Sequence, residues 1–238
     1  MKKIFISCLF ITLASCSSKK EGNMIVQGTI KRLQKGTLYL QKMNDSILFS
    51  VDSVTIYGKD MFKLSDNVDS PEMYFLTFDG NTTEKRIMFF GEQGTITIND
   101  HIEKFGLSPV ITSSENQKVM DDYFKMTTQF QNKRLSLIEE DFLARKEKDT
   151  QKIIEIQEKS MNLIKRRYLF ATNYAINNAH YEAAPYIALT DLADANTKLL
   201  DTIHSSLSPE IKQSMYGKKL TRFIKRIKEN ERYDSITK

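Results

Sequence analysis

The chain has 238 residues, of which 40% are hydrophobic and 27% are charged, and its formal net charge is +5. These fractions are typical of a soluble globular protein, and a charge of this size does not predict nucleic-acid binding. The two cysteines, Cys8 and Cys16, both lie near the N-terminus. The body of the chain therefore offers no thiol for a disulfide, a redox CxxC motif or a cysteine-bound metal.

Residues 1–15 have the layout of a secretory signal. Lys2 and Lys3 precede an apolar run that is shorter than the about 20 residues a membrane-spanning helix needs. Leu13-Ala14-Ser15-Cys16 follows, and this order resembles the lipobox of bacterial lipoproteins. The resemblance implies cleavage before Cys16 and lipidation of its thiol. The alternative is an ordinary secretory signal with a chance cysteine.

Residues 16–23 form a polar segment, which we interpret as a tether between the lipid and the fold. Ser17, directly after the cysteine, resembles the sorting position of lipoproteins that reach the outer membrane. The charged residues close behind it loosely resemble the surface-export signals of Bacteroidota lipoproteins. We therefore expect an outer-membrane lipoprotein whose body faces either the periplasm or the cell surface.

Residues 24–111 predict an antiparallel β domain. Short runs of β-branched and aromatic residues alternate with turn signals such as Asn44-Asp45-Ser46 and Gly91-Glu92-Gln93-Gly94, and helical spacing is absent. Many short strands with brief connections are typical of a sandwich or an open barrel. The predicted strands are Met24–Leu33, Thr37–Lys42, Ile47–Tyr57, Met61–Leu64, Met73–Phe78, Lys85–Phe90 and Thr95–Ile98.

Residues 112–238 predict an α-helical domain, so the fold class is α+β. Ser114 and Gln117 have the spacing of a capping box, and no glycine or proline follows until residue 185. Apolar residues recur in steps of three and four on both sides of the polar break Lys148-Asp149-Thr150, which predicts a long antiparallel helical hairpin. Two shorter helices are expected afterwards, at Glu182–Leu200 and from Ser208-Pro209 onward.

No motif predicts a catalytic, metal or cofactor site. The histidines His101, His180 and His204 are scattered and lack metal-ligand spacing. Asp191 and Asp194 share a helix face by their spacing, which allows a carboxylate enzyme, although a solvated surface explains them as well. We therefore predict a protein without catalytic activity of its own.

The most distinctive polar stretch is Lys218–Lys228, a basic amphipathic helix. Its cations are candidates for contact with a partner or with anionic lipid, unless the apolar stripe simply docks and the cations stay solvated. These candidates are Lys218, Lys219, Arg222, Lys225 and Arg226. A second set of residues, in the β domain, lines either a ligand groove or a core: Tyr39, Tyr74, Phe75, Phe78, Phe89 and Phe90.

Several short motifs resemble the uncharacterised N-terminal β domain (domain of unknown function 4369) of Bacteroidota thiol-disulfide oxidoreductase lipoproteins. In most of those proteins a thioredoxin-like module follows, but the present sequence reaches Lys238 without a CxxC motif, so we expect no thiol–disulfide exchange by this chain. The motifs are Ile25-Val26-Gln27-Gly28-Thr29-Ile30, Gly36-Thr37-Leu38-Tyr39-Leu40, Asp52-Ser53-Val54 with Gly58-Lys59, Pro71-Glu72-Met73-Tyr74-Phe75-Leu76, Gly94-Thr95-Ile96-Thr97-Ile98, and Ser208-Pro209-Glu210-Ile211-Lys212 through Tyr216-Gly217-Lys218.

The sequence thus predicts a lipid-anchored binding or adaptor protein of the cell envelope. Its expected partners are the membrane, through the N-terminal lipid, and an envelope protein or a small ligand of open identity. The alternative is an accessory subunit that acts in trans with a separate thioredoxin-like oxidoreductase. No cofactor, metal or nucleic acid is expected.

Overall fold

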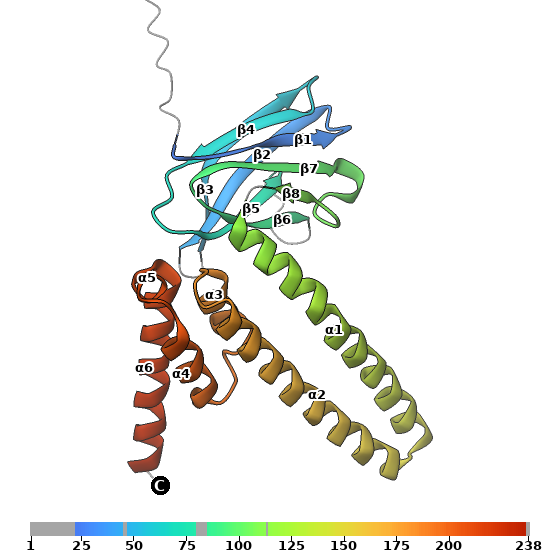
Figure 1. Ribbon diagram of the computed structural model, residues 1–238. Coiled ribbons are helices and arrows are strands. Elements are labelled where there is room, and N and C mark those ends of the chain that lie inside the picture. The colour runs from blue at the N-terminus through green and yellow to red at the C-terminus, as the bar shows by residue number, and fades with distance from the viewer. Residues whose placement is uncertain (1–21, 45–46, 80–84, 113, 237–238) are drawn as a thin grey trace, which may run out of the picture.

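The computed structural model describes residues 22–44, 47–79, 85–112 and 114–236 of the chain. Within them the strands come first and the helices follow, so the predicted α+β class is confirmed (Figure 1). The predicted signal peptide, Cys16 and nearly all of the tether lie outside the described residues. None of the helices in the described ranges is long and apolar enough to cross a membrane.

The β domain consists of two four-stranded sheets, one in the order β4-β1-β7-β8 and the other in the order β3-β2-β5-β6. Seven strands lie where the sequence predicts them, whereas the three-residue β8 follows Pro109 in a segment without strand periodicity. The strands are β1 (Met24–Lys31), β2 (Lys35–Asn44), β3 (Ile47–Tyr57), β4 (Met61–Asp66), β5 (Glu72–Phe78), β6 (Arg86–Gly91), β7 (Gly94–His101) and β8 (Val110–Thr112).

One strand pair departs from the antiparallel pattern. Strands β1 and β7 run parallel, with Met24 opposite Gly94 and Lys31 opposite His101. No hairpin turn joins these two strands, because the chain forms the whole second sheet between them, and so no tight turn fixes their relative direction. Gly28 lies at this pairing, where a Cβ atom would overlap the carbonyl oxygen of Ile98.

The two sheets enclose the first hydrophobic core. Inward-facing residues alternate along the strands, as a half-buried sheet requires. Val26, Leu40, Leu76 and Phe89 are among the fully buried side chains of this core, and Tyr74 stacks on Phe89 with 5.9 Å between ring centroids.

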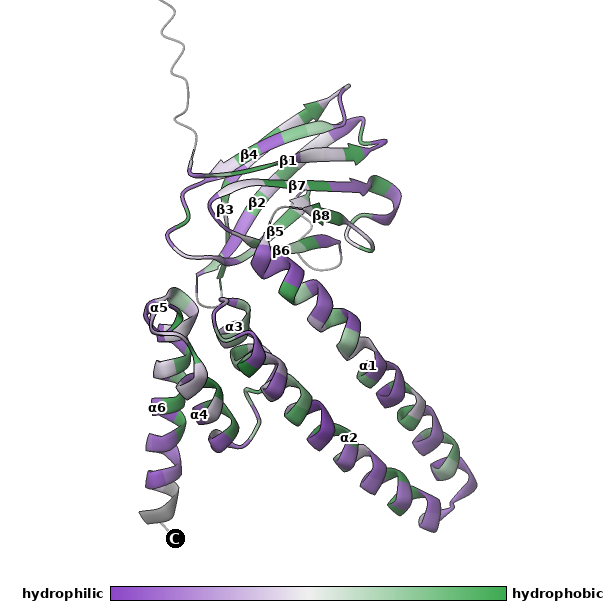
Figure 2. Ribbon diagram, in the orientation of Figure 1, coloured by the Kyte–Doolittle hydropathy of each residue, from purple (hydrophilic) through white to green (hydrophobic). Residues whose placement is uncertain are grey.

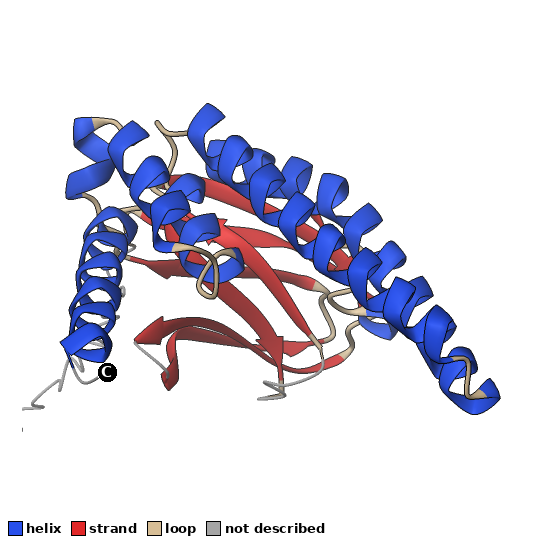
Figure 3. Cartoon of the chain, turned by 90° about the horizontal axis from the view of Figure 1, so that it is seen from below, coloured by secondary structure: helices blue, strands red, loops and turns tan. Residues whose placement is uncertain are grey.

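Strand β5 is buried on both faces, which the sandwich alone does not explain. Tyr74 and Leu76 point into the sandwich, whereas Met73 and Phe75 belong to a second core formed with the helices. Phe90 of β6 also belongs to this second core and makes edge contacts with Tyr186 and Tyr216. The helices thus cover the outer side of one sheet, as a view from the helical end shows (Figure 3).

The predicted hairpin consists of α1 (Glu115–Glu147) and α2 (Thr150–Asn177). The Ser114 hydroxyl accepts a hydrogen bond from the Gln117 N–H, which confirms one half of the capping box. The other half is absent, because the Gln117 side chain accepts from the Phe90 N–H of β6 at 2.8 Å instead. Gln117, in the first turn of the hairpin, therefore also ties the hairpin to the sheet.

The two predicted shorter helices are each divided in two. The chain bends after α3 (Ala183–Asp191), and Asn196 caps α4 (Thr197–Ser206) by accepting from the Lys198 N–H. Ser214 similarly separates α5 (Pro209–Gln213) from α6 (Met215–Ile236), since its hydroxyl accepts from the Gly217 N–H. The apolar spacing predicts two continuous helices, but the side chains of Asn196 and Ser214 bind backbone N–H groups and so begin a new helix in each case.

Gly217 marks the close crossing of α5 and α6. A Cβ atom at this position would overlap the backbone carbonyl oxygen of Ile211, which belongs to the preceding helix. We expect Gly217→Ala to lower the free energy of unfolding by about 1–3 kcal/mol, since overpacking forces the backbone apart. Urea denaturation followed by circular dichroism measures this change. Alanine favours a helix more than glycine does, so a loss of stability would report the overlap and not the loss of glycine itself. Equal stability of Gly217→Ala and the wild type would contradict the tight crossing.

Candidate functional site

A cleft of about 560 Å³ opens where the outer face of the β2–β5 sheet meets the helices. We call it the junction cleft. Its walls come from β2, β5, α3 and α6, elements far apart in the sequence, and its volume falls within the range of about 300–1,000 Å³ typical of ligand sites. It is lined by Met43, Glu72, Met73, Phe75, Tyr186, Leu189, Thr190, Met215, Tyr216, Lys219, Arg222, Phe223 and Arg226.

One wall of the junction cleft carries three cations from α6. Lys219, Arg222 and Arg226 follow one another in steps of three and four, so they share one side of the helix. Within the described part of the chain none of them forms an ion pair; Lys219 and Arg226 instead lie over the rings of Tyr216 and Phe223, at 5.7 and 5.6 Å. This wall therefore presents positive charge that the protein does not neutralise there.

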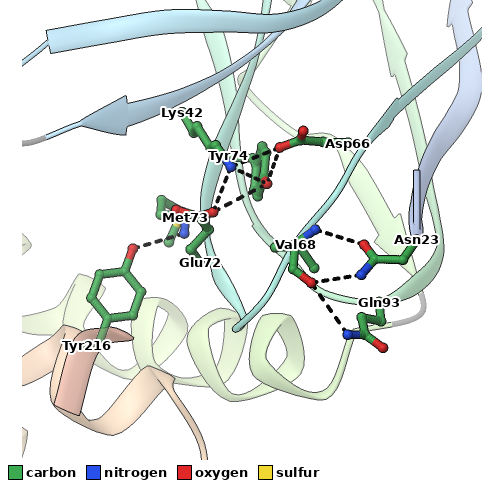
Figure 4. A network of polar contacts seen from close by, with 9 residues as sticks. All are labelled: Asn23, Lys42, Asp66, Val68, Glu72, Met73, Tyr74, Gln93 and Tyr216. Carbon is green, nitrogen blue, oxygen red and sulfur yellow. Dashed lines mark hydrogen bonds and ion pairs between the residues drawn. The ribbon is translucent and has the colours of Figure 1, made fainter. Parts of the chain in front are cut away.

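The floor of the junction cleft is apolar and is held in place by the sheet. Met73 and Phe75 point outward from β5, and the Tyr216 hydroxyl accepts a hydrogen bond of 2.9 Å from the Met73 backbone N–H (Figure 4). Burial raises the pKa of Tyr216, so the phenol stays neutral at physiological pH. The position of α6 relative to β5 is thus fixed by a buried bond at the cleft itself.

Glu72, the one carboxylate in the lining, is part of a charge network. Its carboxylate and that of Asp66 bind the Lys42 ammonium at 3.0 and 2.9 Å, and the Tyr74 hydroxyl donates to Asp66 at 2.7 Å (Figure 4). Burial alone would lower the pKa of Lys42, but the hydrogen bonds to the two carboxylates outweigh it and raise that pKa. Burial also raises the pKa of Tyr74. The network is therefore a fixed ion cluster and leaves the α6 cations without a counter-charge.

Asn23 secures the entry of the chain into the fold beside this network. Its side chain accepts from the Val68 N–H at 2.8 Å and donates to the Val68 carbonyl at 2.9 Å, and Gln93 also donates to that carbonyl (Figure 4). A residue at the edge of the predicted tether is therefore already part of the folded body.

A buried carboxylate lies under the start of α6. Glu182 is 2% exposed, and its Oε1 accepts a hydrogen bond of 2.5 Å from the hydroxyl of Ser70, in the loop between β4 and β5. Its Oε2 forms no hydrogen bond of ordinary geometry, although Ser214 and the Tyr216 backbone N–H lie near the carboxylate. Burial therefore raises the pKa of Glu182, and these polar neighbours offset only part of that effect.

The structure separates the five predicted contact cations. Lys219, Arg222 and Arg226 line the junction cleft, whereas Lys218 and Lys225 lie outside it. The apolar stripe of the same helix docks, with Leu220 and Ile224 buried in the second core. The stripe therefore packs, as the second interpretation expects, and contact of the cations with a partner or with lipid stays a prediction.

The aromatic residues singled out in the β domain mostly form cores. Tyr74 and Phe89 are buried inside the sandwich, and Phe90 lies against the helices. Only Phe75 reaches the junction cleft. The remaining lining residues, among them Tyr186, Leu189 and Met215, carry no sequence signal, because they converge only through the packing of α3 and α6 on β5.

The candidate carboxylates and histidines are dispersed. Asp191 accepts a hydrogen bond of 2.6 Å from the buried Tyr123 hydroxyl, which gives it a structural role in joining α1 to α3. His101 accepts from the Glu103 N–H, and His204 shares a hydrogen bond with Thr221. Among the residues whose placement is described, no group of three or more histidine, cysteine, aspartate or glutamate side chains is arranged to hold a metal ion.

The fold defines a class of protein: a two-sheet β domain whose outer face is covered by a C-terminal helical unit. Residues 24–120 match the family model named Domain of unknown function (DUF4369), so this N-terminal region is a domain of that family. The match includes the eight strands of the described residues and the start of α1. No curated protein and no solved structure matches the chain.

The raised pKa of Glu182 has a consequence for stability. The Glu182 carboxyl group binds its proton more tightly in the folded state than in the unfolded state. Its protonation therefore contributes fully to the free energy of unfolding below the ordinary pKa of 4.5, and this contribution is lost as the pH rises through the pKa of the folded state. We expect Glu182→Gln to remove this loss and to be at least as stable as the wild type at pH 7. Chemical denaturation of both proteins at several pH values measures the difference. An unchanged pH dependence in the variant would show that Glu182 is not the group responsible.

Proposed function

We propose that this chain is a lipid-anchored binding protein of the cell envelope, without catalytic activity of its own, and that its ligand or partner group binds in the junction cleft. The observation that carries the proposal is the combination, in one cavity, of an apolar floor with three cations that lack acidic partners in the described structure. The cleft residues supply charge and apolar surface, which suits binding and positioning.

The composition of the cleft favours an anion with an apolar body. Arginine binds carboxylates and phosphates through paired hydrogen bonds, and both Arg222 and Arg226 are exposed on the wall. Met215, Phe223 and Phe75 offer the adaptable and aromatic surface that an alkyl chain or an apolar side chain contacts. A fatty acid, an acidic lipid or an acidic peptide with apolar residues has this chemistry.

The anchor is the second part of the proposal. The lipobox resemblance at Cys16 supports a lipid-modified N-terminus, and Ser17 supports placement at the outer membrane, with the body facing the periplasm or the surface. Asn23 fixes the point where the chain enters the fold, so only a short segment separates Cys16 from the body. The junction cleft would therefore operate close to the membrane that carries the anchor.

The ligand proposal predicts the behaviour of a charge-neutral variant of the cleft. A fluorescent long-chain fatty acid should bind the wild type saturably, and Arg222→Gln with Arg226→Gln should weaken this binding by about tenfold or more, because charge-assisted hydrogen bonds contribute about 1.5–3 kcal/mol each. Titration of the probe fluorescence measures the dissociation constant.

The chain supplies a matched control for this experiment. Lys218→Gln with Lys225→Gln removes the same charge from the same helix but leaves the junction cleft unchanged. This control should bind as the wild type does. If both double variants weakened binding equally, the overall charge of α6, and not the cleft, would be responsible. If the wild type did not bind the fatty acid saturably, this class of ligand would be rejected.

The anchor proposal is tested separately. Cys16→Ala should abolish incorporation of radiolabelled palmitate and release the body from the membrane fraction, because the modified thiol is removed. Cell fractionation after metabolic labelling measures both effects. Persistent labelling of the variant would overturn the lipoprotein interpretation without bearing on the cleft.

Crosslinking of the anchored protein in its native envelope distinguishes the adaptor role from the accessory role. A stoichiometric protein partner at the α6 face would support an adaptor. A partner with a thioredoxin-like fold would instead favour the alternative that the sequence raises, an accessory subunit of a separate oxidoreductase.

A further inference from the structure

The distal half of the α1–α2 hairpin buries little and leaves large apolar side chains exposed. Its buried core cluster consists of Leu137, Ala144 and Ile156. Leu135, by contrast, is 65% exposed and Met161 is 55% exposed, which is high for side chains of this size. Figure 1 shows this half extending away from the rest of the molecule, and Figure 2 shows hydrophobic residues among the hydrophilic ones along both helices.

A groove of about 1,110 Å³ lies along this half of the hairpin, and we call it the hairpin groove. Its lining residues run from Phe130 to Arg145 on α1 and from Ile156 to Tyr168 on α2. The groove therefore follows the two helices for about four turns, or about 22 Å. The buried Leu137 and Ile156 form part of its floor.

The two sides of the hairpin groove carry exposed apolar side chains in helical spacing. Leu135 and Ile138 lie on the α1 side, and Met161 and Ile164 lie on the α2 side. A single alkyl chain on the floor would leave these side chains in water, whereas a helix about 10 Å wide covers both rows at once. The volume also exceeds the about 300–1,000 Å³ that is typical of small-ligand sites. The shape of the groove therefore favours a helix as its occupant.

The hairpin groove has an excess of positive charge. Arg134, Arg145 and Arg167 line it, and Asp141, the one acid in the lining, is already bound by Arg145 at 2.6 Å. In the described part of the chain Arg134 and Arg167 form no ion pair, and Arg167 lies over the Tyr168 ring at 5.3 Å. Two arginines thus remain uncompensated beside apolar surface, and carboxylates on the occupant would neutralise them.

The residue types of the hairpin groove favour a protein over a lipid surface. Arginine, methionine and aromatic residues are enriched in protein–protein interfaces, whereas lysine and glutamate are depleted. The described lining has this composition, with three arginines, Met161, Phe130 and Tyr168, and with no lysine or glutamate. Lys133 and Lys159 of the same helices lie outside it. An anionic membrane attracts lysine and arginine alike, so it would not explain this separation.

We infer that the hairpin groove binds an acidic amphipathic helix of a partner protein. The apolar stripe of that helix lies between α1 and α2, and its flanking carboxylates bind Arg134 and Arg167. A helix of about 15 residues spans the length of the groove. The hairpin groove and the junction cleft have no lining residue in common, so the inference goes beyond the proposed function and does not depend on it.

Fluorescence anisotropy with a labelled model helix tests the inference. The probe is a peptide of about 16 residues, with leucine at alternating steps of three and four and glutamate beside that stripe. The purified full chain, in nanodiscs of uncharged phosphatidylcholine that accommodate a lipid anchor, should bind this acidic peptide saturably. The same peptide with lysine in place of each glutamate should bind about tenfold or more weakly, because like charges then meet in the groove.

A pair of double variants locates the binding site. Arg134→Gln with Arg167→Gln should weaken binding of the acidic peptide by about tenfold or more, because two charge-assisted contacts are lost. Lys133→Gln with Arg166→Gln is the matched control, because it removes the same charge from neighbouring exposed positions that do not line the groove. This control should bind as the wild type does, and circular dichroism confirms that each variant is folded.

Three outcomes would overturn the inference. A wild type that does not bind the acidic peptide saturably, or that binds the lysine peptide equally well, would assign the groove to lipid or to a second copy of the chain. Equal weakening by the matched control would show that the charge of the hairpin as a whole attracts the peptide. Loss of binding in Arg222→Gln with Arg226→Gln, which should bind normally, would place the peptide in the junction cleft instead.

Discussion

The double-sided burial of β5 is the constraint on which the arrangement of this molecule depends. A strand with large apolar residues on both faces needs a second layer outside the sandwich, and the helices supply it. Met73 and Phe75 pack into that layer, and the Met73 N–H donates to the buried Tyr216 hydroxyl. Glu182 repeats this linkage at the loop before β5 through Ser70. The helical unit is thus a structural continuation of the β domain, joined to it by side-chain packing and by buried polar bonds.

The junction cleft follows from this packing. The start of α6 is held against β5 by Tyr216, and the next turns of the helix then bring Lys219, Arg222 and Arg226 into the lining of the cleft. Glu72 is the one acid in the lining, and Lys42 already neutralises it. Positive charge therefore remains beside an apolar floor, in a cavity that neither the β domain nor the helices would form alone. The binding role that we propose rests on this convergence of two units.

Much of the fold is predictable because its signals are local. Turn residues and β-branched runs identify seven of the eight strands, and polar breaks identify the helical hairpin. What local patterns miss is set by distant contacts: the parallel β1–β7 pair, the division of the shorter helices at Asn196 and Ser214, and the use of Gln117 to bond β6. The basic helix is likewise visible in the sequence. The sequence does not show which of its cations line a cavity. The other walls of the cleft, such as Tyr186 of α3 and Met43 of β2, come from elements whose motifs are unrelated to those of the basic helix.

Native-state hydrogen exchange of the full chain would test most directly whether the sheet and the helices form one unit. If β5 depends on its outer layer, the amides of Met73 and Phe75 and those of Ile187 and Ile224 should open with the same free energy as denaturant is added. Exchange of the α3 and α6 amides at a clearly lower free energy, while β5 stays protected, would contradict this account. The helices would then be a separable unit, and the junction cleft would exist only while that unit is docked on the sheet.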